Sequence, residues 1–482
     1  MADSRSFRTC DVVVVGGGFA GAWVACRLAQ RGVTVILISA DDVLPPVSRA
    51  LSIGLMRRQF VEDATARRAE FFTDSSASLP PAVPPLIAEY LGREFDALTE
   101  LVRYREFLQY LMPVVPERGL RVGLGDEVVA AVLAEFQRCG GIRLRGRVTD
   151  LVMEGDACRG LHYEQGGVHG QLFGADVVLA SGGFCGLFAD GVGSNSGHVL
   201  GTYARHGGAL ANLEMFARFP LGDLDRKVPV YPFELEGAPH LMRADATAHE
   251  LIELLEVYDG DLVDLEVFRR YWIRNFDVPH TIASPRGRSR LGPIKGFSMG
   301  GMAISMTGET VRNVHAVGEC AYDLAVDSVS GKPFATYLAL GGMLADQLAD
   351  RRHSSVVEPG SGVSRANASA DAQLRALVEQ GLSSFQDNRF SFERAERFVD
   401  WCRTERRVRQ REDCTGNEDV DLLILAEAYA CSVLARTESR GFFYRPDFPA
   451  PDPALAGAVT VARYDASADQ VLASLVHHVN QG

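Results

Sequence analysis

The stretch VVVVGGGFAGAWVACRLAQRGVTVILIS, which runs from Val12 to Ser39, decides the fold. Its four consecutive valines are typical of a parallel strand that is buried on both faces. Gly16, Gly18 and Gly21 follow with the spacing G-x-G-x-x-G, which allows a tight turn, a close approach of backbone to a pyrophosphate, and close packing of helix on strand. A helix from about Ala20 to Arg31 then directs its positive N-terminal end at the phosphates. The stretch therefore predicts a dinucleotide-binding unit.

The end of the second expected strand departs from the usual dinucleotide pattern. This strand, Val33 to Ile38, is followed by Ser39, where an acidic residue that binds a ribose usually stands. A hydroxyl or the backbone must therefore make the ribose contact. The order of strand, glycines, helix and strand still favours a bound dinucleotide over a glycine-rich turn that holds no ligand.

Length and composition narrow the class of protein. A chain of 482 residues is longer than one nucleotide-binding domain, so two or three domains are expected. The net charge of −13 argues against a nucleic-acid partner. The sequence has no apolar run of about 18 residues and no signal-like N-terminus, so we expect a cytoplasmic protein without a membrane partner. Nine cysteines without a C-x-x-C pair predict neither a metal site nor a disulfide framework.

Changes in pattern divide the rest of the chain. A proline-rich stretch, residues 75–92, ends the first region, and residues 126–139 have the pattern of an amphipathic helix. Residues 142–183 read as short strands and hairpins that end in a buried strand. Residues 215–293 look like an inserted segment with helices of its own. From about Asp371 onward the pattern is helical.

Five segments in order along the chain resemble the flavoprotein family of L-aspartate oxidase, succinate dehydrogenase and fumarate reductase. The most specific is RTESRGFFYRPDFP (436–449), which is similar to the ESRG…Y/H-R-x-D-x-P signature of that family's C-terminal helical domain. The others are ASGGFCG (180–186), GGALANLEMFARFP (207–220), FSMGGMAI (297–304) and NVHAVGECA (313–321). The resemblance spans nearly the whole chain.

The resemblance implies FAD as the dinucleotide and an α/β fold. A Rossmann-like FAD-binding domain is expected over residues 1–214 and 294–360, with an inserted α+β capping domain over residues 215–293. A C-terminal helical domain is expected over residues 361–482. The capping domain of such a fold closes over the site and excludes water during hydride transfer.

The resemblance also implies which residues hold the cofactor. Glu319 is expected to hold a ribose or ribityl hydroxyl, since a buried carboxylate needs hydrogen-bond donors; a strand-end surface charge is the alternative. Ser48 and Gly54 should line the pyrophosphate and the isoalloxazine, and the backbone at Val148 should meet the adenine. The full set of expected cofactor contacts is Gly16, Gly18, Gly21, Ser39, Ser48, Gly54, Val148, Gly182, Glu319 and Thr336.

Several absences narrow the flavin chemistry. Residues 47–55 contain no histidine, whereas the membrane-complex relatives carry a flavin-linking histidine there, so non-covalent FAD is expected. Residues 187–197 are loop-like and offer no helix to receive a second pyrophosphate, which disfavours a bound NAD(P)H. Iron–sulfur ligands are missing as well. Electrons should therefore leave to oxygen or to another acceptor.

The family's cationic substrate pocket is only partly present. RRYWIR (269–274) is the best match to the family's R-D-V-V-A-R, which puts Arg269 at the proton-transfer position and Arg274 at the second arginine. A solvated helix face explains this segment almost equally well. The family's substrate-binding histidine is replaced by Gly296. Lys332 stands for a carboxylate-binding arginine, although an ammonium cannot make the same bidentate contact.

Other residues are candidates to complete this altered pocket. His198 and His240 could act as the base or bind substrate, because imidazole titrates near neutrality; a lone histidine is more often structural. Glu234 could bind a substrate ammonium, and Phe297 could form an aromatic wall. A surface position for Glu234 and core packing for Phe297 are the alternatives.

These observations favour an FAD-dependent oxidase or dehydrogenase of the L-aspartate oxidase type. It would oxidise an amino acid or an amine-bearing carboxylate by hydride transfer, at a C–N or a C–C bond. One alternative is the reduction of an activated alkene, as in soluble fumarate reductases. Another is a non-catalytic flavin-binding partner subunit whose pocket has decayed.

Overall fold

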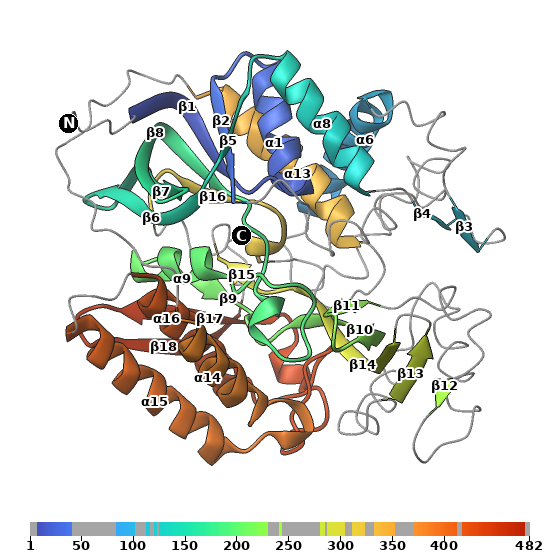
Figure 1. The fold of residues 1–482 in the computed structure, drawn as a ribbon, viewed down its shortest axis with the longest axis vertical. Coiled ribbons are helices and arrows are strands. Elements are labelled where there is room, and N and C mark those ends of the chain that lie inside the picture. Colours follow the sequence, from blue (N-terminus) through green and yellow to red (C-terminus); the bar gives the residue numbers. More distant parts are fainter. Residues whose placement is uncertain are drawn as a thin grey trace.

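In its described part, the computed structural model has three larger sheets and one two-stranded hairpin, with helices packed around the larger sheets (Figure 1). Among the helices in its described part, none is long and apolar enough to cross a membrane. The structure describes residues 7–40, 83–101, 112–115, 120–122, 125–229, 241–242, 280–284, 287–303, 311–322, 332–351, 371–411 and 417–477.

The central sheet is the Rossmann-like part of the fold. Its strands have the order β5-β2-β1-β8-β7-β6, with β16 also paired to β8. Strands β5, β2, β1, β8 and β16 run parallel, while β7 and β6 form an antiparallel extension. The bounds are β1 Phe7–Val15, β2 Val35–Ser39, β5 Ile142–Arg145, β6 Arg147–Glu154, β7 Ala157–Gln165, β8 Val168–Leu179 and β16 Val314–Ala316.

Alternating side chains of β1 enter two different cores. Val12 and Val14 pack with the helices α1, α6, α8 and α13, which group on one side of the sheet (Figure 1). Val13 and Val15 belong to the larger core, which continues into the C-terminal helices. All four valines are almost fully buried, as a parallel strand covered on both faces requires. These helices are α1 Phe19–Gln30, α6 Val83–Leu101, α8 Gly125–Arg138 and α13 Lys332–Ala349.

Two further sheets lie below the central one in Figure 1. One is antiparallel with the order β11-β10-β14-β13-β12, and the other has the order β15-β9-β17-β18; a small hairpin, β3-β4, stands apart. Their bounds are β3 Met112–Val115, β4 Leu120–Val122, β9 Leu210–Ala211, β10 Phe216–Asp223, β11 Val228–Pro229, β12 Leu241–Met242, β13 His280–Ser284, β14 Gly287–Ser298, β15 Gly301–Met302, β17 Ala458–Asp465 and β18 Gln470–His477.

The C-terminal region combines helices with two strands. Helix α16 packs against α15, α14 and α9, and also against β17 and β18. The sequence pattern indicated only helices here, so the β17–β18 hairpin is an addition to that prediction. Helix α9 directly follows residues 187–197, after which no helix was expected. The bounds are α9 His198–Arg205, α14 Ala372–Ser383, α15 Phe392–Arg411 and α16 Asn417–Ala435.

The α/β class and the first βαβ unit agree with the sequence analysis. The helix expected over residues 126–139 is α8, and the buried strand expected at the end of residues 142–183 is the end of β8. Within residues 215–293 the described elements are strands, and the helices expected there fall outside the described residues. The four domain boundaries stay predictions.

Candidate functional site

Three loops meet at the carboxyl end of the central sheet. They follow β1, β8 and β16, and backbone hydrogen bonds tie the neighbouring strand ends together. Ala180 N–H donates to Val15 O at 2.8 Å, and Val317 N–H donates to Leu179 O at 3.0 Å. In open α/β sheets ligands bind at this edge, where the chain connections diverge. The edge is therefore the place to test for a dinucleotide site.

The backbone around the first loop is so crowded that only glycine fits at certain positions. Gly16 has φ +110°, and a Cβ on it would lie 2.1 Å from Ala180 O. A Cβ on Gly21 would lie 2.0 Å from Gly16 O, so any larger residue would push helix α1 away from the loop. Gly18 is the N-cap residue of α1, and no side chain caps the helix there.

The start of helix α1 has the features of a phosphate cradle. Its first turn carries no acidic residue, so nothing opposes a bound anion. The loop after β16 reaches this turn: Gly318 has φ +81°, and a Cβ on it would lie 2.7 Å from Ala20 Cβ. The two glycine loops and the helix end thus fit the pyrophosphate of a dinucleotide.

Ser39 lies beside this loop at the end of β2. A Cβ on Gly17 would lie 3.0 Å from Ser39 Oγ, so the hydroxyl faces the glycines. The carbonyl oxygen of Ser39 accepts a hydrogen bond from Gly146 N–H at 2.9 Å. This position suits the expected ribose contact, which stays a prediction.

Glu319 occupies the short 3-10 turn η3 (Gly318–Cys320) after β16. Its Oε1 accepts a hydrogen bond from Ser298 N–H at 2.9 Å, and Ser298 Oγ lies 3.3 Å from the same oxygen. Gly183, in the loop after β8, leaves room for this pair: a Cβ there would lie 2.3 Å from Glu319 Oε1. Glu319 is partly exposed, whereas Ser298 is fully buried. The role of Glu319 in holding a cofactor hydroxyl stays a prediction.

His198 and Val148 lie together, at the first residue of α9 and in β6. The His198 Nε2–H donates to Val148 O at 3.1 Å. Burial of the ring, together with the charge of Arg147, lowers the pKa of His198 to about 4. The ring is therefore neutral at neutral pH and a weak base. If the Val148 backbone meets the adenine, as predicted, His198 lies at the adenine end rather than near the reacting ring.

Three other predicted residues occupy defined places. Phe297 is buried in β14 as part of the larger core, which is the packing role considered as its alternative. Thr336 is buried in α13. Gly182 has φ +77° and approaches Asn195, whose Nδ2 donates to Ser181 O at 2.8 Å.

Much of the expected substrate pocket cannot be placed. Lys332 begins α13, but its side chain is outside the described part. The predicted residues outside the described ranges altogether are Ser48, Gly54, Glu234, His240, Arg269 and Arg274.

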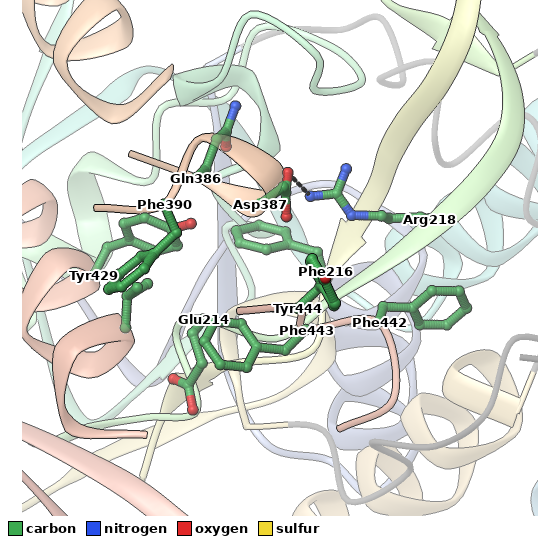
Figure 2. Close-up of a pocket in the computed structure, with 11 residues that line it drawn as sticks. Glu214, Phe216, Arg218, Gln386, Asp387, Phe390, Tyr429, Phe442, Phe443 and Tyr444 are labelled. Atoms are coloured by element: carbon green, nitrogen blue, oxygen red, sulfur yellow. Dashed lines mark hydrogen bonds and ion pairs between the residues drawn. The ribbon is translucent and has the colours of Figure 1, made fainter. Parts of the chain in front are cut away.

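A buried cluster of charges was not foreseen from the sequence (Figure 2 shows part of it). Lys295 Nζ donates to both oxygens of Asp190, at 2.7 and 2.6 Å, and to Gln386 Oε1 at 2.8 Å. Arg218 joins Asp190 at 3.2 Å to Asp387 at 2.6 Å. Burial alone would raise the pKa of Asp190, but the charges of Lys295 and Arg218 outweigh it, and the pKa falls to about 2. The two cations and two carboxylates of the cluster balance in charge.

A small cavity beside this cluster does not suit a carboxylate substrate (Figure 2). It holds about one water molecule, and aromatic side chains form most of its wall. Glu214 Oε2 is buried and has no hydrogen-bond partner among the described residues, which a water in this cavity would supply. The lining residues are Glu214, Phe216, Arg218, Gln386, Asp387, Phe390, Tyr429, Val433, Phe442, Phe443 and Tyr444.

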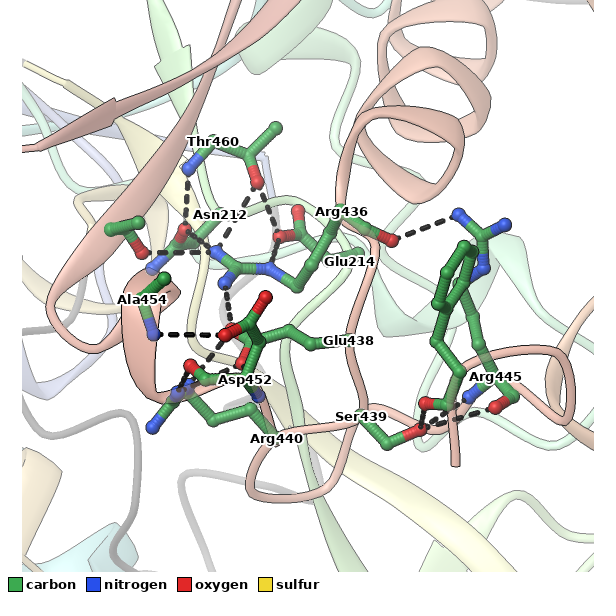
Figure 3. Close-up of polar contacts among 12 residues, drawn as sticks. Asn212, Glu214, Arg436, Glu438, Ser439, Arg440, Arg445, Asp452, Ala454 and Thr460 are labelled. Atoms are coloured by element: carbon green, nitrogen blue, oxygen red, sulfur yellow. Dashed lines mark hydrogen bonds and ion pairs between the residues drawn. The ribbon is translucent and has the colours of Figure 1, made fainter. Parts of the chain in front are cut away.

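The segment 436–449 is a clamp between the C-terminal region and the rest of the chain (Figure 3). Buried Arg436 donates to Glu214 Oε1 at 2.5 Å, to Glu438 Oε1 at 2.9 Å and to Asn212 Oδ1 at 2.9 Å. Arg445 donates to the carbonyl oxygens at the end of α16, including Val433 O at 2.9 Å, and so caps that helix. The charged residues of this motif hold the fold together.

Comparisons with known proteins agree with this architecture. Residues 11–106 match the profile of the FAD dependent oxidoreductase family, and residues 415–478 match the profile named Fumarate reductase flavoprotein C-term. L-aspartate oxidase from Pyrococcus furiosus is 22% identical over 486 residues, with 91% of this chain and 96% of that protein covered. L-aspartate oxidase from Mesorhizobium japonicum is 25% identical over 505 residues, with 92% of each covered.

A solved structure shows the same fold along almost the whole chain. A variant of the E. coli quinol fumarate reductase FrdA superposes with a TM-score of 0.71 at 15% identity, covering 99% of this chain and 98% of that one. The glycine edge and these comparisons together define an FAD-dependent oxidoreductase. The chain is similar over nearly its whole length to L-aspartate oxidases and to a fumarate reductase flavoprotein, which confirms the resemblance, the fold class and FAD as the cofactor.

Proposed function

We propose that this chain oxidises an amino acid or an amine-bearing carboxylate, in the manner of an L-aspartate oxidase. The crowded glycine edge, which fits a dinucleotide, is the observation that carries the proposal. The full-length similarity to L-aspartate oxidases supports the substrate class. Oxygen or another small acceptor would take the electrons. We also propose, as expected from the sequence, that the FAD is bound non-covalently and that the protein is cytoplasmic.

Different residues of the chain would hold different parts of the cofactor. Gly16, Gly18 and Gly21 with the start of α1 would hold the pyrophosphate, and Glu319 would hold a hydroxyl of the ribose or the ribityl chain. When bound, FAD supplies the acceptor for a hydride from the substrate carbon. The glycines matter because they let backbone N–H groups approach the phosphates where a side chain would block them.

The substrate carboxylates need cations, and the structure limits which ones are free to serve. Gly296 replaces the histidine that relatives carry, so a neighbouring cation would have to substitute for it. Lys295 is adjacent but is 1% exposed and bonded to Asp190 and Gln386, so it is not that cation. Arg274 and Lys332 are therefore proposed to bind the substrate carboxylates.

The proton-transfer group is proposed to be Arg269 rather than a histidine. His198, a weak base beside Val148, suits a positioning role better than proton transfer at neutral pH. His240 stays a candidate for the base, and Glu234 a candidate for the substrate ammonium. Phe297 is buried in β14, so it would contribute to the wall of the pocket only from the side of the core.

Reduction of an activated alkene is the second candidate function. The match of residues 415–478 to a fumarate reductase C-terminal profile is the observation that favours it. The same residues would then bind an unsaturated carboxylate, and an external donor would supply the electrons. The two functions differ in the direction of hydride transfer, which an experiment can measure directly.

The experiment is an anaerobic titration followed by visible spectroscopy. Amino acids, amines and dicarboxylates are added in turn to the FAD-loaded protein, and bleaching of the flavin band by an amine-bearing carboxylate is the expected result. Turnover of an enoate with reduced viologen, without bleaching by any amine, would favour the alternative. Arg269→Gln should slow bleaching at least about 100-fold. Arg270→Gln is the matched control, because Arg270 is the next residue on the chain and has no proposed role.

A further inference from the structure

We propose that Ser298 is a positioning residue that orients the Glu319 carboxylate toward the cofactor. The inference rests on the proposed role of Glu319 in binding an FAD hydroxyl. Ser298 is the last residue of β14 and Glu319 lies in η3, so the pair joins two segments that are separate in the chain.

Two donors from one residue fix the carboxylate. The Ser298 N–H donates to Glu319 Oε1 at 2.9 Å, and its hydroxyl lies 3.3 Å from that oxygen and 3.4 Å from Glu319 O. Hydrogen bonds to a charged acceptor are stronger than those between neutral groups. Because both donors act on Oε1, this oxygen of the carboxylate has a set position at the edge of the sheet.

The surroundings hold Ser298 itself in place. Met299 N–H donates to Met215 O at 2.9 Å, directly after Ser298. A Cβ on Gly300 would lie 2.0 Å from Asn212 O, so the strand end crosses the neighbouring backbone at close contact. On the other side, a Cβ on Gly183 would lie 2.0 Å from Ser298 Oγ. With no room to shift, the serine can transmit its position to the carboxylate.

A purely structural serine would have different consequences. Loss of its hydroxyl would lower the stability of the protein but leave FAD binding unchanged. If Ser298 acts through Glu319, removing the hydroxyl should weaken FAD binding, and only while the carboxylate is present. The two explanations therefore separate in a double-mutant cycle.

The experiment measures the Kd of FAD for the full-length apoprotein by quenching of flavin fluorescence. Ser298→Ala should raise the Kd about three- to tenfold, and Ser298→Thr, which keeps the hydroxyl, should stay within about twofold. Ser432→Ala is the matched control, because this buried hydroxyl donates to Ala428 O in its own helix, at 2.8 Å, and has no role proposed in cofactor binding. It should leave the Kd unchanged.

The cycle is completed with Glu319→Ala, which should raise the Kd at least about tenfold. In that background Ser298→Ala should change the Kd by less than about twofold. If Ser298→Ala does not fold, Ser298→Cys tests the same point, since it adds no atom to the side chain and donates only a weak hydrogen bond.

The possible outcomes distinguish the role of Ser298 from the role of Glu319. If Glu319→Ala weakens binding but Ser298→Ala does not, the positioning role is wrong and the role of Glu319 stands. If Ser298→Ala acts equally with and without Glu319, its effect does not pass through the carboxylate, and the inference is overturned. If Glu319→Ala leaves the Kd unchanged, the proposed cofactor role of Glu319 fails, and the inference fails with it.

Discussion

The cofactor edge and the Arg436 clamp join distant segments by opposite means. At the edge, Gly16 and Gly21 allow backbones to approach closely, and Gly183 leaves room for the side chains of Ser298 and Glu319. In the clamp, Arg436 joins two carboxylates, Glu214 and Glu438, inside the protein. A substitution at the cofactor edge would cause a local steric clash, whereas a substitution of Arg436 in the clamp would leave buried charge without a partner. The first should affect ligand binding most, and the second stability.

The same contrast explains what the family motifs do in this chain. FSMGGMAI and GGALANLEMFARFP meet where a Cβ on Gly300 would lie 2.0 Å from Asn212 O. RTESRGFFYRPDFP then joins that crossing through Arg436 and Asn212, at 2.9 Å. These motifs assemble the scaffold. They can therefore persist in a chain whose substrate-binding positions, such as Gly296, have changed.

The largest expected effect is the loss of Arg436. Arg436→Met should lower the free energy of unfolding by about 3–5 kcal/mol, because it leaves the buried carboxylate of Glu214 without the guanidinium that pairs with it, whereas Glu438 keeps its ion pair with Arg440. Urea denaturation measures this. Arg397→Met is the control, since its partner Glu393 is exposed and the pair should be worth less than about 0.5 kcal/mol. A loss under about 1 kcal/mol for Arg436→Met would show that the clamp is not what holds the C-terminal region.

A side chain at the glycine edge should affect ligand binding next most strongly. Gly16→Ala should weaken FAD binding about 100-fold, because φ is +110° and the new Cβ would lie 2.1 Å from Ala180 O. Gly155→Ala is a matched control in the left-handed region, with no atom within 4 Å of the new Cβ. It should cost about 1 kcal/mol of stability and leave FAD affinity unchanged. Equal effects of both variants on the Kd would remove the steric explanation.

The titration of His198 tests a third kind of contact, made by a side chain that is neutral at neutral pH. The folded pKa of about 4 lies below the ordinary 6.5, so the unfolded chain takes up a proton first as the pH falls. Stability is therefore full above about pH 6.5 and declines between about pH 6.5 and 4. Between about pH 7 and 5 the wild type should lose about 2 kcal/mol more than His198→Gln, which keeps a donor for Val148 O. Parallel pH profiles of the two proteins would contradict this.

The smallest expected effect is at Ser39, beside the glycine loop. Ser39→Ala should raise the Kd of FAD about threefold, since water can replace a hydroxyl at a partly exposed site. Ser467→Ala, which removes a hydroxyl bonded to Asp465 in an exposed turn, should leave the Kd unchanged. An effect at Ser39 as large as that of Gly16→Ala would mean that ribose contacts matter as much as the phosphate cradle.

The local sequence pattern predicts the elements that interactions between residues close in sequence determine. The valine run of β1, the glycines and helix α1 follow from the sequence alone, and α8 was placed within one residue at each end. The α9 helix and the β17–β18 hairpin were not foreseen, because neighbours distant in sequence stabilise them.

The candidate site was predictable only where a motif marks it. Glu319 was named from its resemblance, but its partner Ser298 gives no local signal of the contact. The pairing of Lys295 with Asp190 spans 105 positions, and no periodicity reports such a pairing. The substrate residues were the least predictable part, since the family's histidine is absent and its replacements have no motif of their own.

The most direct test of the account is the flavin content and reduction of the purified protein. We expect a yellow protein with one FAD per chain, released intact on acid precipitation, and bleached anaerobically by an amine-bearing carboxylate. A colourless protein to which added FAD does not bind would contradict the assignment of the glycine edge. A bound flavin that every amine-bearing carboxylate leaves oxidised would contradict the proposed reaction.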